Sequence, residues 1–316
     1  MFLQIIILII GFIVLIKGAD LFVDAASSLA ANFKVSKMLI ALTIVSFGTS
    51  APELSVSIKS MLSGSGDIVL GNVIGSNILN ILLILGVSGF VHFLNVKNAT
   101  VRKELPIVIL LSSLLVVLMN DVFISSSKVN SLTRSDGITI LLFFMVFVYY
   151  LISTMRNKTD KSDDKPKYNI LKSIIFTIVG IVCLILGSNA VVDAASHIAL
   201  MLGVSERMIS LTIIALGTSL PELVTSVMAT KKGEYDIAIG NVVGSNIFNI
   251  GIVLGLPVAL FGGIKSFSIN MTDIVIMLAS TILLFIFSYK DNKISKIEGI
   301  IFLNIFAIYY SFVIFA

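Results

Sequence analysis

The sequence contains an internal repeat, and this repeat limits the folds open to the chain. Residues 18–86 align without a gap on residues 187–255, and about half of the aligned positions are identical. The identities include Gly, Ser, Thr, Asn, Pro and Glu, which a helix that merely faces lipid does not require. The chain is therefore expected to contain two related units that build one structure.

Each copy of the repeat carries a distinctive six-residue motif. Segment 48–53 reads Gly-Thr-Ser-Ala-Pro-Glu, and segment 217–222 reads Gly-Thr-Ser-Leu-Pro-Glu. Both motifs stand inside long apolar stretches, where a carboxylate is costly and by default marks a functional site. Glu53 and Glu222 are therefore the leading candidates for functional residues, and a purely structural role is the weaker interpretation.

The composition indicates an integral membrane protein. Hydrophobic residues make up 57% of the chain and charged residues 13%, against about 25% charged residues in a typical soluble domain. A transmembrane helix needs about 20 apolar residues, so the chain is expected to be all-α with ten transmembrane helices. The expected spans are roughly 2–26, 37–61, 68–92, 104–120, 136–155, 170–197, 206–230, 237–261, 271–289 and 297–315.

The number of spans predicts how the two units are related. Five spans fall in each half, and an odd number makes the second half enter the membrane from the opposite side. This inverted-topology repeat is an architecture of secondary transporters, whose site lies near the membrane midplane. The first half is expected at 1–155, with its repeat region at about 37–92. The second is expected at 170–316, with its repeat region at about 206–261, and 156–169 is expected to be a linker.

The basic residues predict the orientation, because Lys and Arg prefer the cytoplasmic loops of a membrane protein. If the N-terminus lies outside, the inner loops hold 16 Lys and Arg residues and the outer loops hold five. Both termini are therefore expected to be extracytoplasmic and linker 156–169 cytoplasmic. The short linker favours a prokaryotic inner or plasma membrane protein.

The first motif predicts a broken helix lined by oxygen atoms. Helical spacings of 4, 3 and 4 residues place Glu53 on one helix face with Ser46, Ser50 and Ser57. Pro52 lacks an N–H donor and disfavours helical geometry at the preceding residue, so carbonyls from about 48 to 50 should lose their helical partners. Such carbonyls are tolerated inside a membrane where they line a cavity or bind a ligand.

The next helix of each unit adds further oxygen ligands. Asn72, Ser76 and Asn80 recur every four residues, and their counterparts in the second copy are Asn241, Ser245 and Asn249. The glycines at 71 and 75, and at 240 and 244, would let helices approach closely, and for these helices a plain packing role stays equally open.

The candidate ligands are all oxygen atoms, which suits a hard cation such as Na⁺, Mg²⁺ or Ca²⁺. The motifs contain neither Cys nor His, which disfavours zinc or copper. Two carboxylates balance one divalent ion, and competition with monovalent ions would give antiport.

At these residues the chain resembles the cation/calcium antiporter superfamily, in particular its sodium/calcium exchanger branch of prokaryotic type. The resemblance covers 1–316 and is carried by GTS-x-PE followed by GN-x-x-GSN-I-x-N, present twice. It implies ten helices in two inverted halves and exchange of Na⁺ for Ca²⁺ by alternating access. It also implies that the first and sixth helices slide over the rest. It implies neither an enzymatic activity nor a cofactor, and the transported ions are Ca²⁺ and Na⁺.

The resemblance also implies roles for individual residues. Glu53 and Glu222 would be the central Ca²⁺ ligands, joined by the carbonyls of Thr49 and Thr218. The Na⁺ sites would use the hydroxyls of Ser50, Ser76, Ser219, Ser245, Thr49 and Thr218 and the carbonyls of Ser46 and Ala215. Asn80 and Asn249 would face the centre. Many family members carry Asp in the place of Asn249, so charge balance and proton sensitivity differ here.

Three alternatives stay open at this point. A Ca²⁺/H⁺ antiporter could use the same scaffold, although that branch typically has GN-x-x-E in place of GTS-x-PE. A cation channel is disfavoured because no four-fold repetition is visible, and an intramembrane hydrolase because no nucleophile with its base is visible. The membrane is the expected surrounding; the sequence implies no nucleic-acid or protein partner and is compatible with a monomer.

Charges near the ends of the first and sixth helices form a further group. Asp24 matches Asp193 in the repeat, and an ion-path vestibule and plain solvation are equally compatible with them. Lys17 is expected either to extend toward the membrane interface or to pair with Asp20. The single cysteine, Cys183, is expected to have a packing role.

Overall fold

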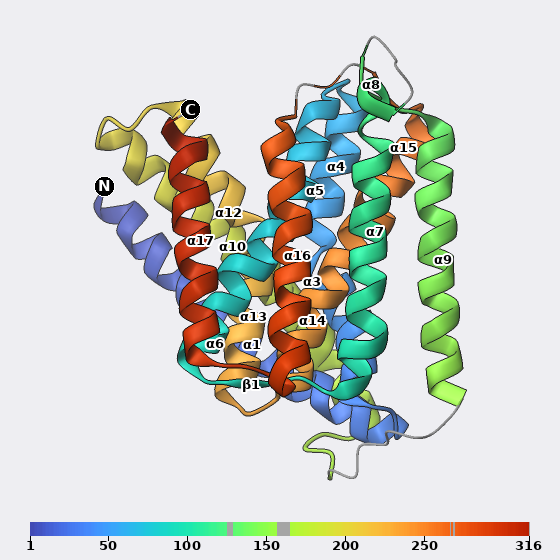
Figure 1. Cartoon of the computed structure of the whole chain (residues 1–316). Helices are drawn as coiled ribbons and strands as arrows, with labels where there is room; N and C mark the ends of the chain where they lie inside the picture. Colours follow the sequence, from blue (N-terminus) through green and yellow to red (C-terminus); the bar gives the residue numbers. More distant parts are fainter. Residues whose placement is uncertain (125–128, 157–164, 266, 268, 316) are drawn as a thin grey trace.

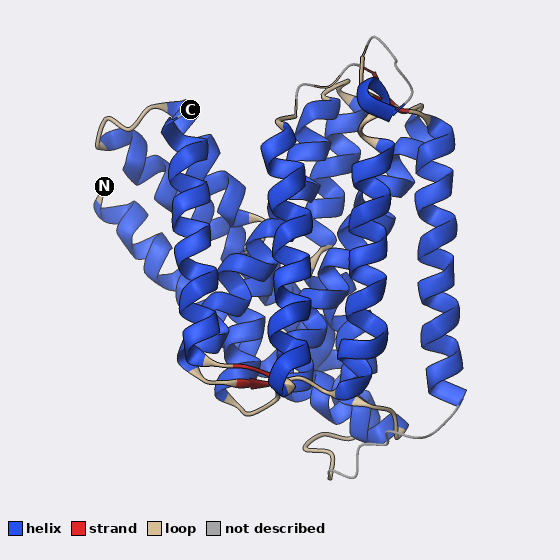
Figure 2. Ribbon diagram, viewed as in Figure 1, coloured by secondary structure: helices blue, strands red, loops and turns tan. Residues whose placement is uncertain are grey.

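The computed structural model describes residues 1–124, 129–156, 165–265, 267 and 269–315. The described chain is mostly helical, with four strands of two residues each (Figure 2). Up to residue 156 the elements, with η marking a π-helical turn, are α1 (Phe2–Phe33), α2 (Lys37–Ile40), η1 (Ala41–Val45), α3 (Ser46–Thr49), α4 (Ala51–Leu62), α5 (Gly66–Leu79), η2 (Asn80–Leu85), α6 (Gly86–Val91), β1 (Leu94–Asn95), η3 (Thr100–Glu104), α7 (Leu105–Leu118), α8 (Asp121–Ile124), β2 (Ser131–Leu132) and α9 (Arg134–Arg156).

The order of helices and π-helical turns from α1 to α6 returns after the linker, from α10 to α15. The elements are α10 (Ile170–Met201), α11 (Glu206–Ile209), η4 (Ser210–Ile214), α12 (Ala215–Gly217), α13 (Leu220–Lys231), α14 (Tyr235–Phe248), η5 (Asn249–Leu254), α15 (Gly255–Phe261), β3 (Ile264–Lys265), α16 (Met271–Asp291), β4 (Lys293–Ile294) and α17 (Lys296–Phe315). The turns η1 and η4 start at equivalent positions of the two repeats, and so do η2 and η5. Such wide turns inside helices often mark functional sites.

Seven helices in the described chain are long and apolar enough to cross a membrane, or eight if the bent pair 37–62 is one span. The expected spans at 104–120 and 206–230 lie outside this count. The segment at 104–120 consists mainly of α7, which has only 14 residues, and the π-helical turn before it, η3, contains charged residues. The segment at 206–230 is divided into α11, η4, α12 and α13.

The two longest helices, α1 and α10, have 32 residues each and lie antiparallel, side by side (Figure 1). Glycines allow their backbones to approach. A Cβ atom added at Gly18 would lie 2.6 Å from Cβ of Cys183, and one added at Gly187 would lie 2.8 Å from the backbone nitrogen of Leu15. Cys183 therefore belongs to this helix–helix contact, as expected for a packing residue.

Short strands join loops that lie far apart in the sequence. Strand β1 pairs antiparallel with β4 through Leu94 and Ile294, and β2 pairs with β3 through Leu132 and Ile264. All four of these side chains are buried. Each pair therefore connects a loop before the linker to a loop after it.

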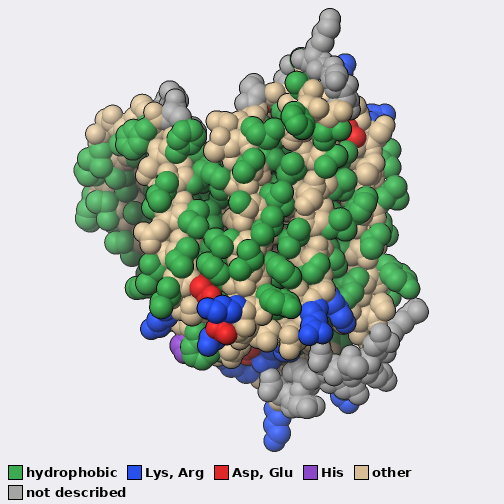
Figure 3. Space-filling model, in the orientation of Figure 1, with side chains coloured by type: hydrophobic (Ala, Val, Ile, Leu, Met, Phe, Trp, Pro, Cys, Tyr) green, Lys and Arg blue, Asp and Glu red, His purple; other side chains and the backbone are tan. Residues whose placement is uncertain are grey.

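The outer surface is apolar over the middle of the molecule and charged toward its ends (Figure 3). On α9, for example, Leu142 and Val146 are 63% and 62% exposed. Exposed apolar side chains at this density are expected of a surface that faces lipid. Both chain termini lie at one end of the molecule, called here the termini end, and residues 165–169 lie at the opposite end, the linker end (Figure 1).

Candidate cation site

The predicted helix break is present in both motifs. Helix α3 ends at Thr49, α4 begins at Ala51, and the two parts are bent by 47°. In the second motif α12 ends at Gly217 and α13 begins at Leu220. The proline is the second residue of the new helix in each case, where a missing N–H is tolerated. The breaks place both glutamates in the first turn of a new helix, where the helix dipole favours a negative charge.

The two carboxylates are buried and are held by serines from the opposite repeat. Glu53 is 0% exposed and Glu222 is 1% exposed. The Ser50 hydroxyl donates to Oε1 of Glu222 over 3.0 Å, and the Ser219 hydroxyl lies 3.4 Å from Oε1 of Glu53. Among the described residues, neither Oε2 atom has a hydrogen-bond partner. Buried polar atoms are rarely left in this state unless a ligand or water satisfies them.

Further hydroxyl groups surround the carboxylates. The Ser219 hydroxyl also lies 3.4 Å from that of Ser76. The Thr49 hydroxyl donates to Oδ1 of Asn241 over 3.0 Å and lies 3.5 Å from the Ser245 hydroxyl. The four residues Ser76, Ser245, Thr49 and Ser219 are all less than 5% exposed. Contacts of this kind link α3 to α14 and the segment before α13 to α5, so the site is shared by both repeats.

Two asparagines present their amide oxygens without partners. The amide nitrogen of Asn80 donates to Asn246, and that of Asn249 donates to Asn77. Oδ1 of Asn80 and Oδ1 of Asn249 are buried and have no hydrogen-bond partner in the described part of the chain. Both residues are the first of a π-helical turn, η2 and η5. Together with the two Oε2 atoms they make four buried oxygens that are open to a cation.

A second pair of asparagines, Asn72 and Asn241, contacts the backbone of the two glutamates. Nδ2 of Asn72 donates to the backbone carbonyl of Glu53 and to the Ser57 hydroxyl, at 3.1 and 3.2 Å. Nδ2 of Asn241 makes the same two contacts with Glu222 and Ser226, at 3.3 and 2.9 Å. The sequence predicts Asn72 as a further oxygen ligand. The structure instead uses its amide nitrogen to fix the start of α4.

The first and second motifs are not packed alike. Ser46 is buried, and its hydroxyl donates to the carbonyls of Ala41, Gly240 and Asn241. Its counterpart Ala215 is exposed and Thr218 is only half-buried, so these two expected ligands lie at the open edge of the cluster. The other ten expected ligand residues are buried.

The glycines that were expected to bring helices together do so in one copy only. Cβ atoms added at Gly240 and Gly244 would lie 2.5 Å from Cβ of Ala41 and 2.1 Å from Oγ of Ser46. Around the corresponding Gly71 and Gly75 no described atom outside their own helices lies within 4 Å. The close approach predicted for both copies is therefore correct for α14 and wrong for α5 in this conformation.

A cavity of about 440 Å³ reaches the cluster from the side that is open. Pro52 and Thr218 line it beside the broken helices, and Lys59 and Asp193 line it toward the end of α4 and within α10. Asp193 thus lines this cavity and is exposed, which is compatible with both of its expected roles. Its repeat counterpart Asp24 is instead ion-paired, as is Asp20, which pairs with Lys232 rather than with Lys17.

The donor atoms point to hard cations. No group of three or more His, Cys, Asp and Glu side chains that could hold a metal ion occurs in the described residues. The candidate site combines two carboxylates with hydroxyls and amide oxygens, a set suited to Na⁺ or Ca²⁺. The Ser50 carbonyl, which was expected to lose its helical partner, accepts from the Leu54 N–H over 3.2 Å. The motifs predict no role for Asn77 and Asn246, although both lie in the repeated Gly-Ser-Asn segment.

Apolar helices around a buried oxygen site define a multi-pass membrane protein of the ion-transporter class. The chain belongs to the sodium/calcium exchanger family: the family model described as sodium/calcium exchanger protein matches residues 3–153 and 172–315. This confirms the resemblance drawn from the two motifs.

Relatives and solved structures agree with this membership. The chain is 37% identical to the inner membrane protein YrbG of Escherichia coli over 81% of this chain and 79% of YrbG. It is 29% identical to the sodium/calcium exchanger MaX1 of Methanosarcina acetivorans over 93% and 94% of the two chains. A structure of the sodium-calcium exchanger NCX_Mj, soaked with Na⁺ and without Ca²⁺, matches with a TM-score of 0.84 and 30% identity, covering 98% of each chain.

Proposed function

We propose that this protein exchanges Na⁺ for Ca²⁺ across the membrane by alternating access, with the ions competing for one site. The site is centred on Glu53 and Glu222 near the membrane midplane. The further ligands we propose are Thr49, Thr218, Ser50, Ser219, Ser76, Ser245, Asn80, Asn249, Ser46 and Ala215. The two ligands at the open edge, Thr218 and Ala215, would join when that side closes over the ions.

The observation that carries the proposal is the pair of buried glutamates whose Oε2 atoms lack partners within the described residues. Two buried negative charges in a membrane need compensation, because an uncompensated buried charge is strongly unfavourable. One Ca²⁺ supplies two positive charges, and so do two Na⁺ ions. A Ca²⁺ ion together with those Na⁺ ions would leave an excess positive charge, so the two cargoes exclude each other. Mutual exclusion at one site is what antiport requires.

We further propose ten membrane crossings in two inverted halves, 1–155 and 170–316, joined by linker 156–169. The segments 100–118 and 206–231 would cross despite their charged or broken starts, because they pack within the bundle rather than against lipid alone. In Figure 1 both termini lie at one end, as ten crossings require. Lys and Arg gather along the linker end of the face in Figure 3, which supports a cytoplasmic linker and extracytoplasmic termini.

The test is transport by purified protein in proteoliposomes. With Na⁺ inside and Ca²⁺ outside, the wild type takes up ⁴⁵Ca²⁺, and Glu53→Gln or Glu222→Gln abolishes this uptake. Glu298→Gln is the matched control, since Glu298 caps α17 through Ser295, away from the site. Full uptake by either site variant would remove that glutamate from the site. Uptake driven by a pH gradient but not by Na⁺ would favour the Ca²⁺/H⁺ antiporter.

A further inference from the structure

Four asparagines form a bridge where α5 and η2 meet α14 and η5. Nδ2 of Asn80 donates to Oδ1 of Asn246 over 2.9 Å, and Nδ2 of Asn249 donates to Oδ1 of Asn77 over 3.1 Å. All four side chains are at most 1% exposed. Each bond crosses from one repeat to the other, so Asn77 and Asn246 each hold the central asparagine of the opposite repeat.

This bridge determines which atom of each central asparagine is available to an ion. An amide can turn over and exchange its oxygen with its nitrogen. If Asn80 turned over, its Oδ1 would face Oδ1 of Asn246, which places two acceptors together in a buried position. The bridge therefore keeps the nitrogen on the asparagine partner and leaves Oδ1 unpartnered among the described residues. An amide nitrogen turned toward the site would repel a cation.

We propose that Asn77 and Asn246 are positioning residues for ion binding, which set the amide orientation of Asn249 and Asn80. The inference rests on the proposed exchange function and adds two residues that are not themselves ligands. Their effect on the ions passes through the central asparagines.

The two hydrogen bonds of this bridge differ in how firmly the accepting asparagine is held, because the amide nitrogens of Asn246 and Asn77 have different partners. Nδ2 of Asn246 lies 3.4 Å from the backbone carbonyl of Asn77, which cannot change its role as an acceptor. Nδ2 of Asn77 faces the thioether sulfur of Met277 at 3.9 Å, a weak acceptor. In the wild type the bond from Asn249 keeps the Asn77 amide in place, but its other contact is weak, so Asn77 is held less firmly than Asn246 and can turn once residue 249 no longer donates to it. A carboxylate is accommodated at 249, where Asn77 would turn and donate to it, but not at 80.

The first experiment is a double-mutant cycle on Ca²⁺ affinity, measured by calorimetry on the purified protein. We expect Asn246→Leu to weaken Ca²⁺ binding about tenfold and Asn80→Ala to do the same. The double variant should be no weaker than Asn80→Ala alone, because Asn246 acts through Asn80. Additive losses would overturn the proposal and leave Asn246 with a structural role. Binding is measured without transport, so this result is independent of whether Na⁺ drives Ca²⁺ uptake.

The second experiment replaces each central asparagine by aspartate, which preserves size and avoids a folding defect from a lost side chain. Asn249→Asp should retain Ca²⁺ binding within about threefold, and Asn80→Asp should lose at least tenfold. In uptake assays Asn80→Asp should raise the KM for Ca²⁺ rather than lower the maximal rate. When Asn77→Leu is combined with Asn249→Asp, the double variant should no longer retain the Ca²⁺ affinity of Asn249→Asp. Equal tolerance at both positions would contradict the difference between the bridges. Asn120→Ala, a buried asparagine at the end of α7, is the control.

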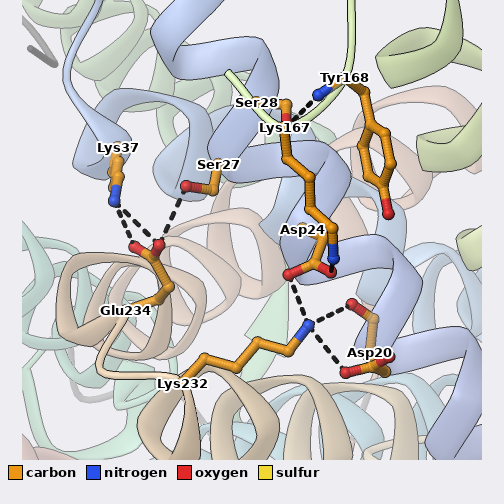
Figure 4. Close-up of polar contacts among 9 residues, drawn as sticks. All are labelled: Asp20, Asp24, Ser27, Ser28, Lys37, Lys167, Tyr168, Lys232 and Glu234. Atoms are coloured by element: carbon orange, nitrogen blue, oxygen red, sulfur yellow. Dashed lines mark hydrogen bonds and ion pairs between the residues drawn. The ribbon is translucent and has the colours of Figure 1, made fainter. Parts of the chain in front are cut away.

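A cluster of ion pairs lies at the linker end (Figure 4). Nζ of Lys232, at the end of α13, lies 2.8 Å from a carboxylate oxygen of Asp20 and 2.5 Å from one of Asp24, both on α1. Asp24 also pairs with Lys167 over 2.6 Å, and Lys37 pairs with Glu234 over 2.7 Å. These contacts tie α1, α2, α13 and the residues after the linker together.

The equivalent positions of the other repeat lack the matching charges. At the equivalent positions of the other repeat, Lys232 corresponds to Ser63, Asp20 to Asn189 and Glu234 to Ser65. There Asp193 lines the cavity instead of being tied to α4. Two inverted repeats with equal sequences would favour neither end. We infer that the cluster of Asp20, Asp24 and Lys232 is an ionic latch that keeps the linker end shut and biases the protein toward opening at the termini end.

The latch is tested with two cysteine reporters in a Cys183→Ala background. Ser55→Cys lies on the cavity, and Val224→Cys occupies the equivalent position toward the linker end. In the detergent-solubilised protein, Lys232→Met should raise the alkylation rate of the cysteine at 224 several-fold and lower that at 55. High salt should act in the same direction, because it screens partly exposed ion pairs. Lys231→Met is the adjacent control. Unchanged rates, or equal effects of both lysine variants, would overturn the latch.

Discussion

The Ser50 hydroxyl donates to Oε1 of Glu222 although the two residues are 172 positions apart. The reciprocal contact, from Ser219 to Glu53, is longer at 3.4 Å. Each carboxylate is thus oriented by a serine from the other repeat. Both halves contribute to the candidate site, and the longer contact lies beside the cavity that opens toward the termini end.

Removing these serines should weaken Ca²⁺ binding unequally. A hydrogen bond to a charged group contributes about 1.5–3 kcal/mol, and about 1.4 kcal/mol corresponds to a tenfold change in affinity. We expect Ser50→Ala to lower Ca²⁺ affinity about tenfold and Ser219→Ala to have a smaller effect, both measured by calorimetry. Ser88→Ala is the control, since its buried hydroxyl has no hydrogen-bond partner in the described chain. The reverse order of the two site variants would contradict the asymmetry.

Two glycines in equivalent positions should respond differently to an added methyl group. Gly244→Ala would place Cβ 2.1 Å from Oγ of Ser46, so it should lower stability by about 1–3 kcal/mol. Gly75→Ala meets no described atom within 4 Å outside its own helix, so it should not lower the melting temperature and should raise it slightly, because alanine is favoured over glycine inside a helix by about 1 kcal/mol. If the alternate state closes α12 onto α5 as α3 now closes onto α14, Gly75→Ala should still slow transport. Unimpaired transport by Gly75→Ala would argue against that closure.

The contact between α1 and α10 offers a compensation test. Gly18→Ala would place Cβ 2.6 Å from Cβ of Cys183 and should lower the melting temperature in detergent, again by a cost of about 1–3 kcal/mol. Replacing Cys183 by glycine removes the opposing atom, so the double variant Gly18→Ala, Cys183→Gly should recover part of the loss. Cys183→Gly alone sets the baseline, because glycine inside a helix costs about 1 kcal/mol. Strictly additive losses would show that the two atoms do not clash.

Withdrawal of Ca²⁺ should destabilise the protein through its site. A ligand at 100 times its dissociation constant stabilises the folded state by about 2.7 kcal/mol. Saturating Ca²⁺ should therefore raise the melting temperature of the wild type, and a chelator should reverse this shift. Glu53→Gln should show no shift, whereas Glu298→Gln should behave as the wild type. A full shift in Glu53→Gln would mean that Ca²⁺ binds elsewhere.

The helix breaks could be predicted from local chemistry alone. Pro52 lacks an N–H whatever its surroundings, so the break after Thr49 follows from the sequence. The grouping of Ser46, Ser50 and Glu53 on one helix face stays a prediction, because the break after Thr49 falls within it and interrupts the helical spacing. Segment 206–230 was expected as one span, and in the structure it is divided, since the π-helical turn η4 and the break after Gly217 interrupt it.

The sequence by itself determined the family, the membrane character and the residue types of the site, because composition, repeat and motif spacing are properties of the chain. The tertiary structure decided which repeat supplies the partner of each side chain. In the folded protein the amide nitrogen of Asn72 donates to the backbone carbonyl of Glu53, and Asp20 pairs with Lys232. The tertiary structure also packed Gly244 while leaving Gly75 open. The two glycines stand in the same motif and carry the same local signal, so only the arrangement of the helices around them could make them different.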